Sequence, residues 1–104
     1  MKNLVKKAVS NSFLAAVVAA SAMTVHAAPD MDKYSKSCAV CHEQGVAGAP
    51  ATGDVAAWEP RLEKGMDNLL ASVKNGLNAM PPMGMCFDCS DDEYRELIKY
   101  MSSA

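Results

Sequence analysis

The chain has 104 residues, enough for one ordinary domain and too few for two. Half of the residues are hydrophobic and 6% are aromatic, which favours a small globular protein over a disordered one. Residues 1–27 hold three lysines and no acid, so residues 28–104 have seven basic and twelve acidic side chains, a net charge of −5. This balance argues against a basic nucleic-acid-binding surface.

The first 27 residues have the pattern of a cleaved signal peptide. Three lysines precede an apolar run of about 13 residues at 13–25, and Val25 and Ala27 are the small residues at positions −3 and −1 of a cut after Ala27. An uncleaved membrane anchor is the alternative, but a spanning helix needs about 20 apolar residues. We therefore expect a signal peptide over 1–27, a mature domain over 28–104 and a periplasmic location.

The mature chain is predicted to be helical from its start. Residues 30–42 have acidic side chains in a first turn and one apolar face, and 43–57 form a loop rich in glycine and alanine. Pro60 can begin a short helix that Gly65 interrupts, and Asp67 is the expected N-cap of the next helix.

The second half of the chain contains one more loop and one more helix. The helix after the expected N-cap ends at Asn75-Gly76, and a loop covers 78–89. Ser90 and Glu93 have the spacing of a capping box for a last helix with an apolar stripe. No alternating strand pattern is present, so we expect an all-α fold of three to five short helices. Two long loops in so small a domain suggest that they surround a cofactor.

A Cys-x-x-Cys-His motif identifies that cofactor. Cys38, Cys41 and His42 match the attachment signature of c-type haem, and His42 is the only histidine of the mature chain. On a helix, residues i, i+3 and i+4 share one side, so both thiols can meet the haem vinyl groups while the imidazole reaches the iron. We therefore predict one haem c, covalently bound through Cys38 and Cys41, with His42 as an iron ligand.

Four cysteines have three other possible uses. A thioredoxin-like pair needs a βαβ pattern, which is missing here. A zinc site needs closer pairs, whereas 44 residues lie between Cys41 and Cys86. In an exported chain, all four cysteines could also form structural disulfides.

The second loop supplies candidate sixth ligands. A thioether is a soft ligand, and a Met/His pair on haem iron raises the potential and suits electron transfer. Met80 stands before Pro81-Pro82, which stiffens the backbone after it, and we predict Met80 as the ligand with Met83 as the alternative. Met85 is a third thioether in the same loop.

A second cysteine pair, Cys86 and Cys89, is not followed by histidine and is therefore not a second haem motif. In an exported protein we expect these two cysteines to form a disulfide before the last helix. A labile, functional disulfide is the alternative to a structural one.

Several short motifs run along residues 30–104: Cys38-x-x-Cys41-His42, Gly48-Ala49-Pro50, Trp58-Glu59-Pro60-Arg61, Gly65-Met66-Asp67, Met80-Pro81-Pro82 and Cys86-x-x-Cys89. On these motifs the mature chain resembles class I cytochromes c, and more closely the cytochrome c5 group of proteobacteria. After Met-Pro-Pro, relatives commonly carry a basic residue and two glycines, whereas this chain has Met83-Gly84-Met85.

The resemblance implies roles for further residues. The Pro50 carbonyl would accept a hydrogen bond from His42, and Met80 would be the distal ligand. Trp58 and Arg61 would bond the haem propionates, against the alternatives of ordinary core and a solvated face. Tyr34 would pack on the last helix, against Leu97, Ile98 and Met101.

These observations predict a soluble one-electron carrier rather than an enzyme, passing electrons between respiratory-chain partners. The acidic surface favours a redox partner with a basic docking patch, and the chain would meet a membrane only through membrane-bound partners. We expect a monomer or a weak dimer. The alternative is a haem-based sensor or enzyme with a labile methionine ligand, which the Met83-Gly84-Met85 sequence motivates.

Overall fold

The computed structural model describes residues 28–104, and the signal peptide expected over 1–27 lies outside the described residues. Within them the chain forms five α-helices, two 3-10 helices and no strand, which confirms the all-α prediction. The elements are α1 (Met31–Lys36), α2 (Ala39–His42), η1 (Val46–Gly48), α3 (Val55–Leu62), α4 (Met66–Asn75), η2 (Pro82–Met85) and α5 (Asp91–Ser103). None of the helices described is long and apolar enough to cross a membrane.

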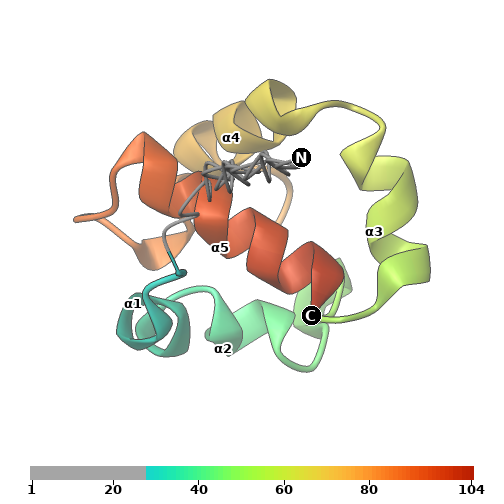
Figure 1. Cartoon of the computed structure of the whole chain (residues 1–104), viewed down its shortest axis with the longest axis horizontal. Coiled ribbons are helices and arrows are strands. Elements are labelled where there is room, and N and C mark those ends of the chain that lie inside the picture. The colour runs from blue at the N-terminus through green and yellow to red at the C-terminus, as the bar shows by residue number, and fades with distance from the viewer. Residues whose placement is uncertain (1–27) are drawn as a thin grey trace, which may run out of the picture.

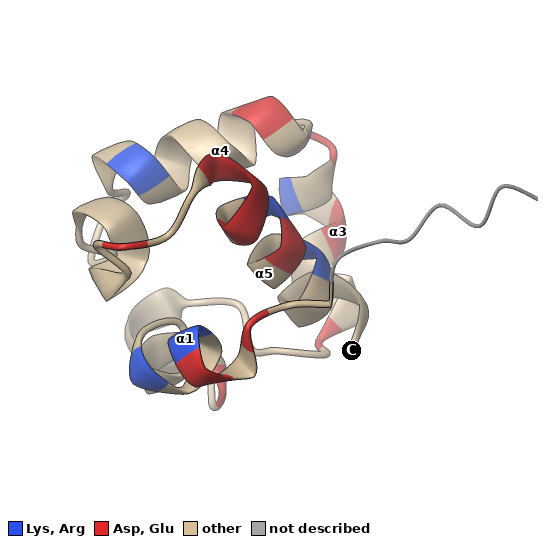
Figure 2. Cartoon of the chain, turned by 60° about the vertical axis from the view of Figure 1, so that its left-hand side comes forward, with Lys and Arg blue, Asp and Glu red and all other residues tan. Residues whose placement is uncertain are grey.

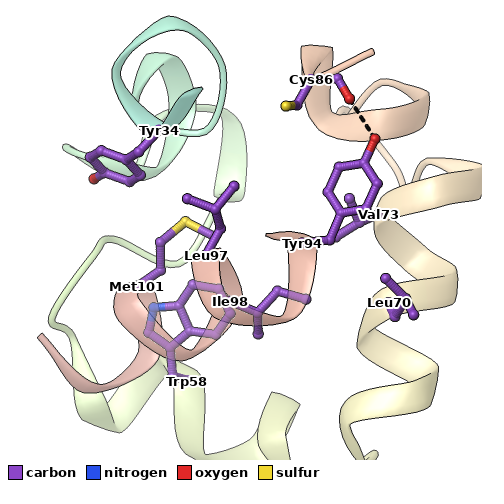
Figure 3. Close-up of a cluster of buried hydrophobic side chains, with 9 residues drawn as sticks. All are labelled: Tyr34, Trp58, Leu70, Val73, Cys86, Tyr94, Leu97, Ile98 and Met101. Carbon is purple, nitrogen blue, oxygen red and sulfur yellow. Dashed lines mark hydrogen bonds between the residues drawn. The ribbon is translucent and has the colours of Figure 1, made fainter. Parts of the chain in front are cut away.

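Helix α5 lies in the middle of the domain, with α1 and α2 on one side and α3 and α4 around the other (Figure 1). Its start is the predicted capping box: the Ser90 hydroxyl accepts from the Glu93 N–H, and the Glu93 carboxylate accepts from the Ser90 N–H. The apolar stripe of α5 is buried and meets side chains from α1, α3 and α4 (Figure 3). The central position of α5 therefore follows from its apolar face.

Tyr34 of α1 belongs to this core, as the resemblance implied, and is 5% exposed. Its ring packs edge-on against Tyr100 at a centroid distance of 5.1 Å, and its hydroxyl is 2.8 Å from the Thr52 hydroxyl. A second link between α1 and α5 is the ion pair of Lys33 with Glu93, at 2.5 Å between nitrogen and oxygen. The hydrogen bond between the two raises the pKa of Lys33 and lowers the pKa of Glu93.

The prediction of one continuous helix over 30–42 is wrong. Helix α1 ends at Lys36 because Ser37 leaves the helical region, with φ −129° and ψ −82°. The Ser37 hydroxyl and the Ser37 N–H both donate to the Lys33 carbonyl, so the two donors of Ser37 close the last turn of α1. Helix α2 then starts afresh after Cys38, so the haem motif has its own short helix.

The predicted starts of the next two helices are also wrong. Helix α3 begins before Pro60, because the Asp54 carboxylate caps it by accepting from the Ala57 N–H. Pro60 is tolerated inside the helix since Ala56, whose carbonyl loses its intrahelical partner, is exposed to water. Helix α4 begins at Met66 after Gly65, whose φ of +85° suits glycine, and Asp67 lies in the first turn.

Candidate haem-binding site

An open cavity of about 200 Å³ lies between two parts of the chain. One set of lining residues comes from 37–50, the other from 77–85, and Arg61 of α3 completes the wall. Most of the lining side chains are apolar, so the cavity suits a largely apolar group.

Two free thiols stand in this wall. Cys38 and Cys41 are both half-buried and line the cavity, one turn apart, with the His42 N–H bonded to the Cys38 carbonyl at 2.9 Å. Burial raises the pKa of the Cys38 thiol. The nucleophilic thiolate of a thioredoxin-like pair needs a lowered pKa, so this environment argues against that alternative.

His42 is held in one orientation by the loop that follows it. Its Nδ1 lies 2.8 Å from the Pro50 carbonyl oxygen, which can only accept, so Nδ1 bears the proton and Nε2 keeps a free electron pair. The ring also stacks on Trp58, with centroids 5.7 Å apart and an angle of 28° between planes. His42 lines the cavity, so a basic imidazole nitrogen is available to a metal there.

Trp58 and Arg61 differ in their position relative to the cavity. The Trp58 N–H donates to the Ala51 carbonyl at 2.9 Å, and its side chain is outside the cavity lining, so a bond from it to a propionate would require this bond to break. Arg61 does line the cavity and uses one N–H to reach the Ala57 carbonyl at 2.6 Å. The rest of its guanidinium has further donors for a carboxylate.

Met80 lines the cavity from the second loop and is half-buried. Its backbone is tied to Leu77 in both directions, with the Met80 N–H donating at 2.9 Å and the Leu77 N–H donating at 3.0 Å. The loop also needs two glycines at close approaches. A Cβ at Gly76 would lie 3.0 Å from the Met80 carbonyl oxygen, and one at Gly84 would lie 3.1 Å from the Met80 methyl carbon. Sequence reasoning missed these packing roles.

The two other methionines of this loop are exposed, Met83 by 40% and Met85 by 45%. Both have positive φ, +64° and +66°, which is unusual for residues other than glycine. Only Met85 joins the cavity lining. The structure therefore places Met85, rather than the predicted alternative Met83, on the wall of the site.

Cys86 and Cys89 form the expected disulfide, which joins the end of this loop to the start of α5. The Asp88 carboxylate lies close to both sulfurs, but sulfurs bonded to each other cannot serve as thiolate ligands, so this trio is not a metal site. The Tyr94 hydroxyl donates to the Cys86 carbonyl. Sequence reasoning placed Tyr94 only in the apolar stripe, although its buried hydroxyl was a signal that it needs a polar partner.

The donor set thus fits haem c. Two thiols and an imidazole with a free Nε2 share one wall of a mostly apolar cavity, and a thioether lines the same cavity. His42 and Met80 are separated by 37 residues in the sequence. Only the fold brings them to the same cavity.

Comparisons with known proteins agree with this chemistry. The family model described as cytochrome c oxidase, cbb3-type, subunit III matches residues 27–101. Cytochrome c5 of Ectopseudomonas mendocina is 53% identical over 73 residues, covering 68% of this chain and 84% of that protein. Cytochrome c5 of Azotobacter vinelandii is 51% identical over 73 residues, with coverage of 68% and 88%. The solved mono-haem ferrocytochrome c from Shewanella putrefaciens superposes with a TM-score of 0.65 at 56% identity, over 75% of this chain and 96% of that one.

The fold and the site define a small mono-haem c-type cytochrome, with haem c attached covalently through Cys38 and Cys41. The chain belongs to the cytochrome c family. It is similar to cytochromes c5 and, like its cytochrome relatives, is an electron-transfer protein rather than an enzyme.

Proposed function

We propose that the chain is a periplasmic one-electron carrier in which His42 and Met80 bind the haem iron from its two sides. The observation that carries this proposal is the bond between His42 Nδ1 and the Pro50 carbonyl, which leaves Nε2 for the iron in a cavity that Met80 also lines. The haem supplies an iron that alternates between the ferrous and ferric states.

Filled axial positions favour a carrier over a sensor or an enzyme. When imidazole and thioether both bind the iron, no coordination position is open to a substrate or a gas. The surroundings of both ligands are fixed, His42 by Pro50 and Trp58, and Met80 by its paired bonds with Leu77. A site that changes little between redox states suits rapid electron transfer.

Export is part of the proposal. The pattern of residues 1–27 directs the chain across the membrane, and the Cys86–Cys89 disulfide is stable in an oxidising compartment. A periplasmic location would place the carrier beside membrane-bound respiratory partners. Cell fractionation with intact-mass analysis tests this step: a periplasmic protein that begins at Ala28 and carries one haem agrees with it, and a cytoplasmic or uncut chain refutes it.

The surface supports a protein partner. Acidic side chains cluster on the first turn of α5, whereas α1 carries both acidic side chains and lysines (Figure 2). The net charge of residues 28–104 is −5. The exposed residues that line the cavity are neutral: Val46, Ala47, Gly48, Leu77, Asn78, Ala79, Pro81 and Met85. We infer that overall charge steers a basic partner at long range and that the neutral rim makes the close contact.

A solved neighbour illustrates such a partner. A cytochrome c crystallised in an electron-transfer complex with nitrite reductase superposes with a TM-score of 0.63 at 43% identity, over 69% of this chain and 88% of that one. This supports a redox enzyme as the partner class.

Absorption spectroscopy of the haem-loaded protein tests the ligand assignment. The wild-type ferric protein should be six-coordinate and low-spin, with the weak far-red band of methionine ligation. Met80→Ala should lose this band and bind carbon monoxide rapidly when ferrous, whereas Met83→Ala should keep the band.

Two other outcomes would contradict the ligand assignment or the carrier function. Loss of the band in Met83→Ala alone would overturn Met80 as the ligand. A wild-type protein that lacks the band, or that binds carbon monoxide at once, would overturn the carrier and favour the sensor or enzyme alternative.

A further inference from the structure

The loop that carries Met80 ends at a doubly anchored residue, Cys86. Its sulfur is bonded to Cys89, and its carbonyl accepts a hydrogen bond from the Tyr94 hydroxyl of α5 (Figure 3). Cys86 and Tyr94 are both buried, 3% and 4% exposed. The disulfide secures the side chain and the hydrogen bond secures the backbone.

Cys86 is connected to the Met80 thioether through short contacts. The Cys86 N–H donates to the Met83 carbonyl at 2.9 Å, and the Gly84 N–H between them donates to the Pro81 carbonyl at 3.0 Å. Gly84 in turn faces the Met80 methyl carbon, which would lie 3.1 Å from a Cβ at that position. A displacement of Cys86 would therefore move the backbone that supports the thioether.

This segment is also held in an unfavourable conformation. Met83 and Met85 both have φ values near +65°, a strained conformation for residues other than glycine that persists only where the surrounding structure enforces it. Only one residue, Gly84, lies between these two methionines. Without an anchor at Cys86, relaxation of these two residues would loosen the turn beneath Met80.

The identity of residue 94 fits the role of an anchor. Tyr94 is buried on the apolar stripe of α5, and a buried phenol needs a partner for its hydroxyl. Here that partner is the Cys86 carbonyl, which is itself in the core. Burial raises the pKa of Tyr94 above its ordinary value, so the hydroxyl keeps its proton near neutral pH.

We propose that Tyr94 is a positioning residue for the distal ligand: its bond to the Cys86 carbonyl keeps the Met80 loop closed and slows dissociation of the thioether from iron. The inference rests on the proposed ligation by Met80. Tyr94 does not line the cavity and acts only through the loop.

The test compares Tyr94→Phe with Tyr34→Phe in the haem-loaded protein. Tyr34 is a matched control, because it is equally buried, it also loses one hydroxyl bond, to Thr52 at 2.8 Å, and it lies on α1 away from the Met80 loop. The rate of cyanide binding to the ferric protein is measured at saturating cyanide, where loss of the native ligand limits the rate. The far-red band and the free energy of unfolding are recorded for each variant.

We expect Tyr94→Phe to bind cyanide about fivefold faster, the ratio that corresponds to one hydrogen bond of about 1 kcal/mol, with a weakened far-red band. Tyr34→Phe should lose similar stability and keep the wild-type cyanide rate. Equal cyanide rates in Tyr94→Phe and wild type, or equal increases in both variants, would overturn the positioning role. A wild-type protein without the far-red band would instead refute the ligation by Met80 on which the role depends.

Discussion

The contact between Gly84 and Met80 allows a substitution of one methyl group to test how tightly the distal loop is packed. Gly84 is buried, with φ +55° and ψ +29°, and an added Cβ would lie 3.1 Å from the Met80 methyl carbon and 3.8 Å from a Val73 methyl carbon. The first distance is shorter than ordinary van der Waals contact. Gly84→Ala must therefore displace the thioether as well as hold alanine in a left-handed conformation.

The conformational part of this effect can be measured separately. Gly65 has φ +85°, has nothing within 4 Å of the position of its Cβ and does not line the cavity, so Gly65→Ala introduces an alanine at positive φ without the contact. An L-residue in this region costs about 1–2 kcal/mol. We expect both variants to lose about this amount of unfolding free energy, and Gly84→Ala to lose about 1 kcal/mol more for overpacking.

The distinguishing assay is the far-red band of the ferric haem protein, followed with cyanide binding. Gly84→Ala should weaken the band and accelerate cyanide entry, because the thioether is pushed from its position, while Gly65→Ala should match wild type. If Gly84→Ala kept a full band and a wild-type cyanide rate, the loop would be soft enough to accommodate a methyl group. That result would refute the dependence of the Met80 position on the packing of this loop.

Leu97 is the most deeply buried core side chain within residues 28–104, at 1% exposed. Leu97→Ala should lower the free energy of unfolding in denaturant titrations by about 2–5 kcal/mol, whereas Val55→Ala at an exposed position should change it little. Glu93→Gln keeps the capping box but loses the charge that pairs with Lys33. The pairing lowers the pKa of Glu93. The urea midpoint of the wild type should therefore exceed that of Glu93→Gln at neutral pH, and the difference should disappear as the pH falls through the lowered pKa. A difference that persists in stronger acid would contradict this origin. Electron transfer to a basic redox protein should slow as salt rises and the Debye length falls to about 10 Å at 0.1 M, and a rate independent of salt would remove the role of the net charge.

Much of the haem-attachment site could be predicted because its geometry is local. Cys38, Cys41 and His42 lie within five consecutive residues, so one helical turn brings them to the same side in any fold. The capping box of Ser90 and Glu93 is equally local, since its bonds span three residues. For such features, the amino-acid order implies the spatial arrangement.

The bond between Pro50 and His42 had a different source. It was implied by resemblance to known cytochromes, and the fold bears it out at 2.8 Å. The same resemblance suggested a propionate bond for Trp58, yet its N–H points to the Ala51 carbonyl and its ring to His42. A motif transferred from relatives thus located the residue near the site without determining its partner.

The rest depended on contacts between segments far apart in the chain. The end of α1 at Ser37, the selection of Met85 over Met83 for the cavity wall and the bond between Tyr94 and Cys86 leave little trace in local patterns. Each is decided by which neighbour satisfies a polar group or fills a space once the helices pack around α5. The sequence by itself determined the covalent haem chemistry and the helical class, because these follow from local spacing, while tertiary packing decided how the distal loop is held.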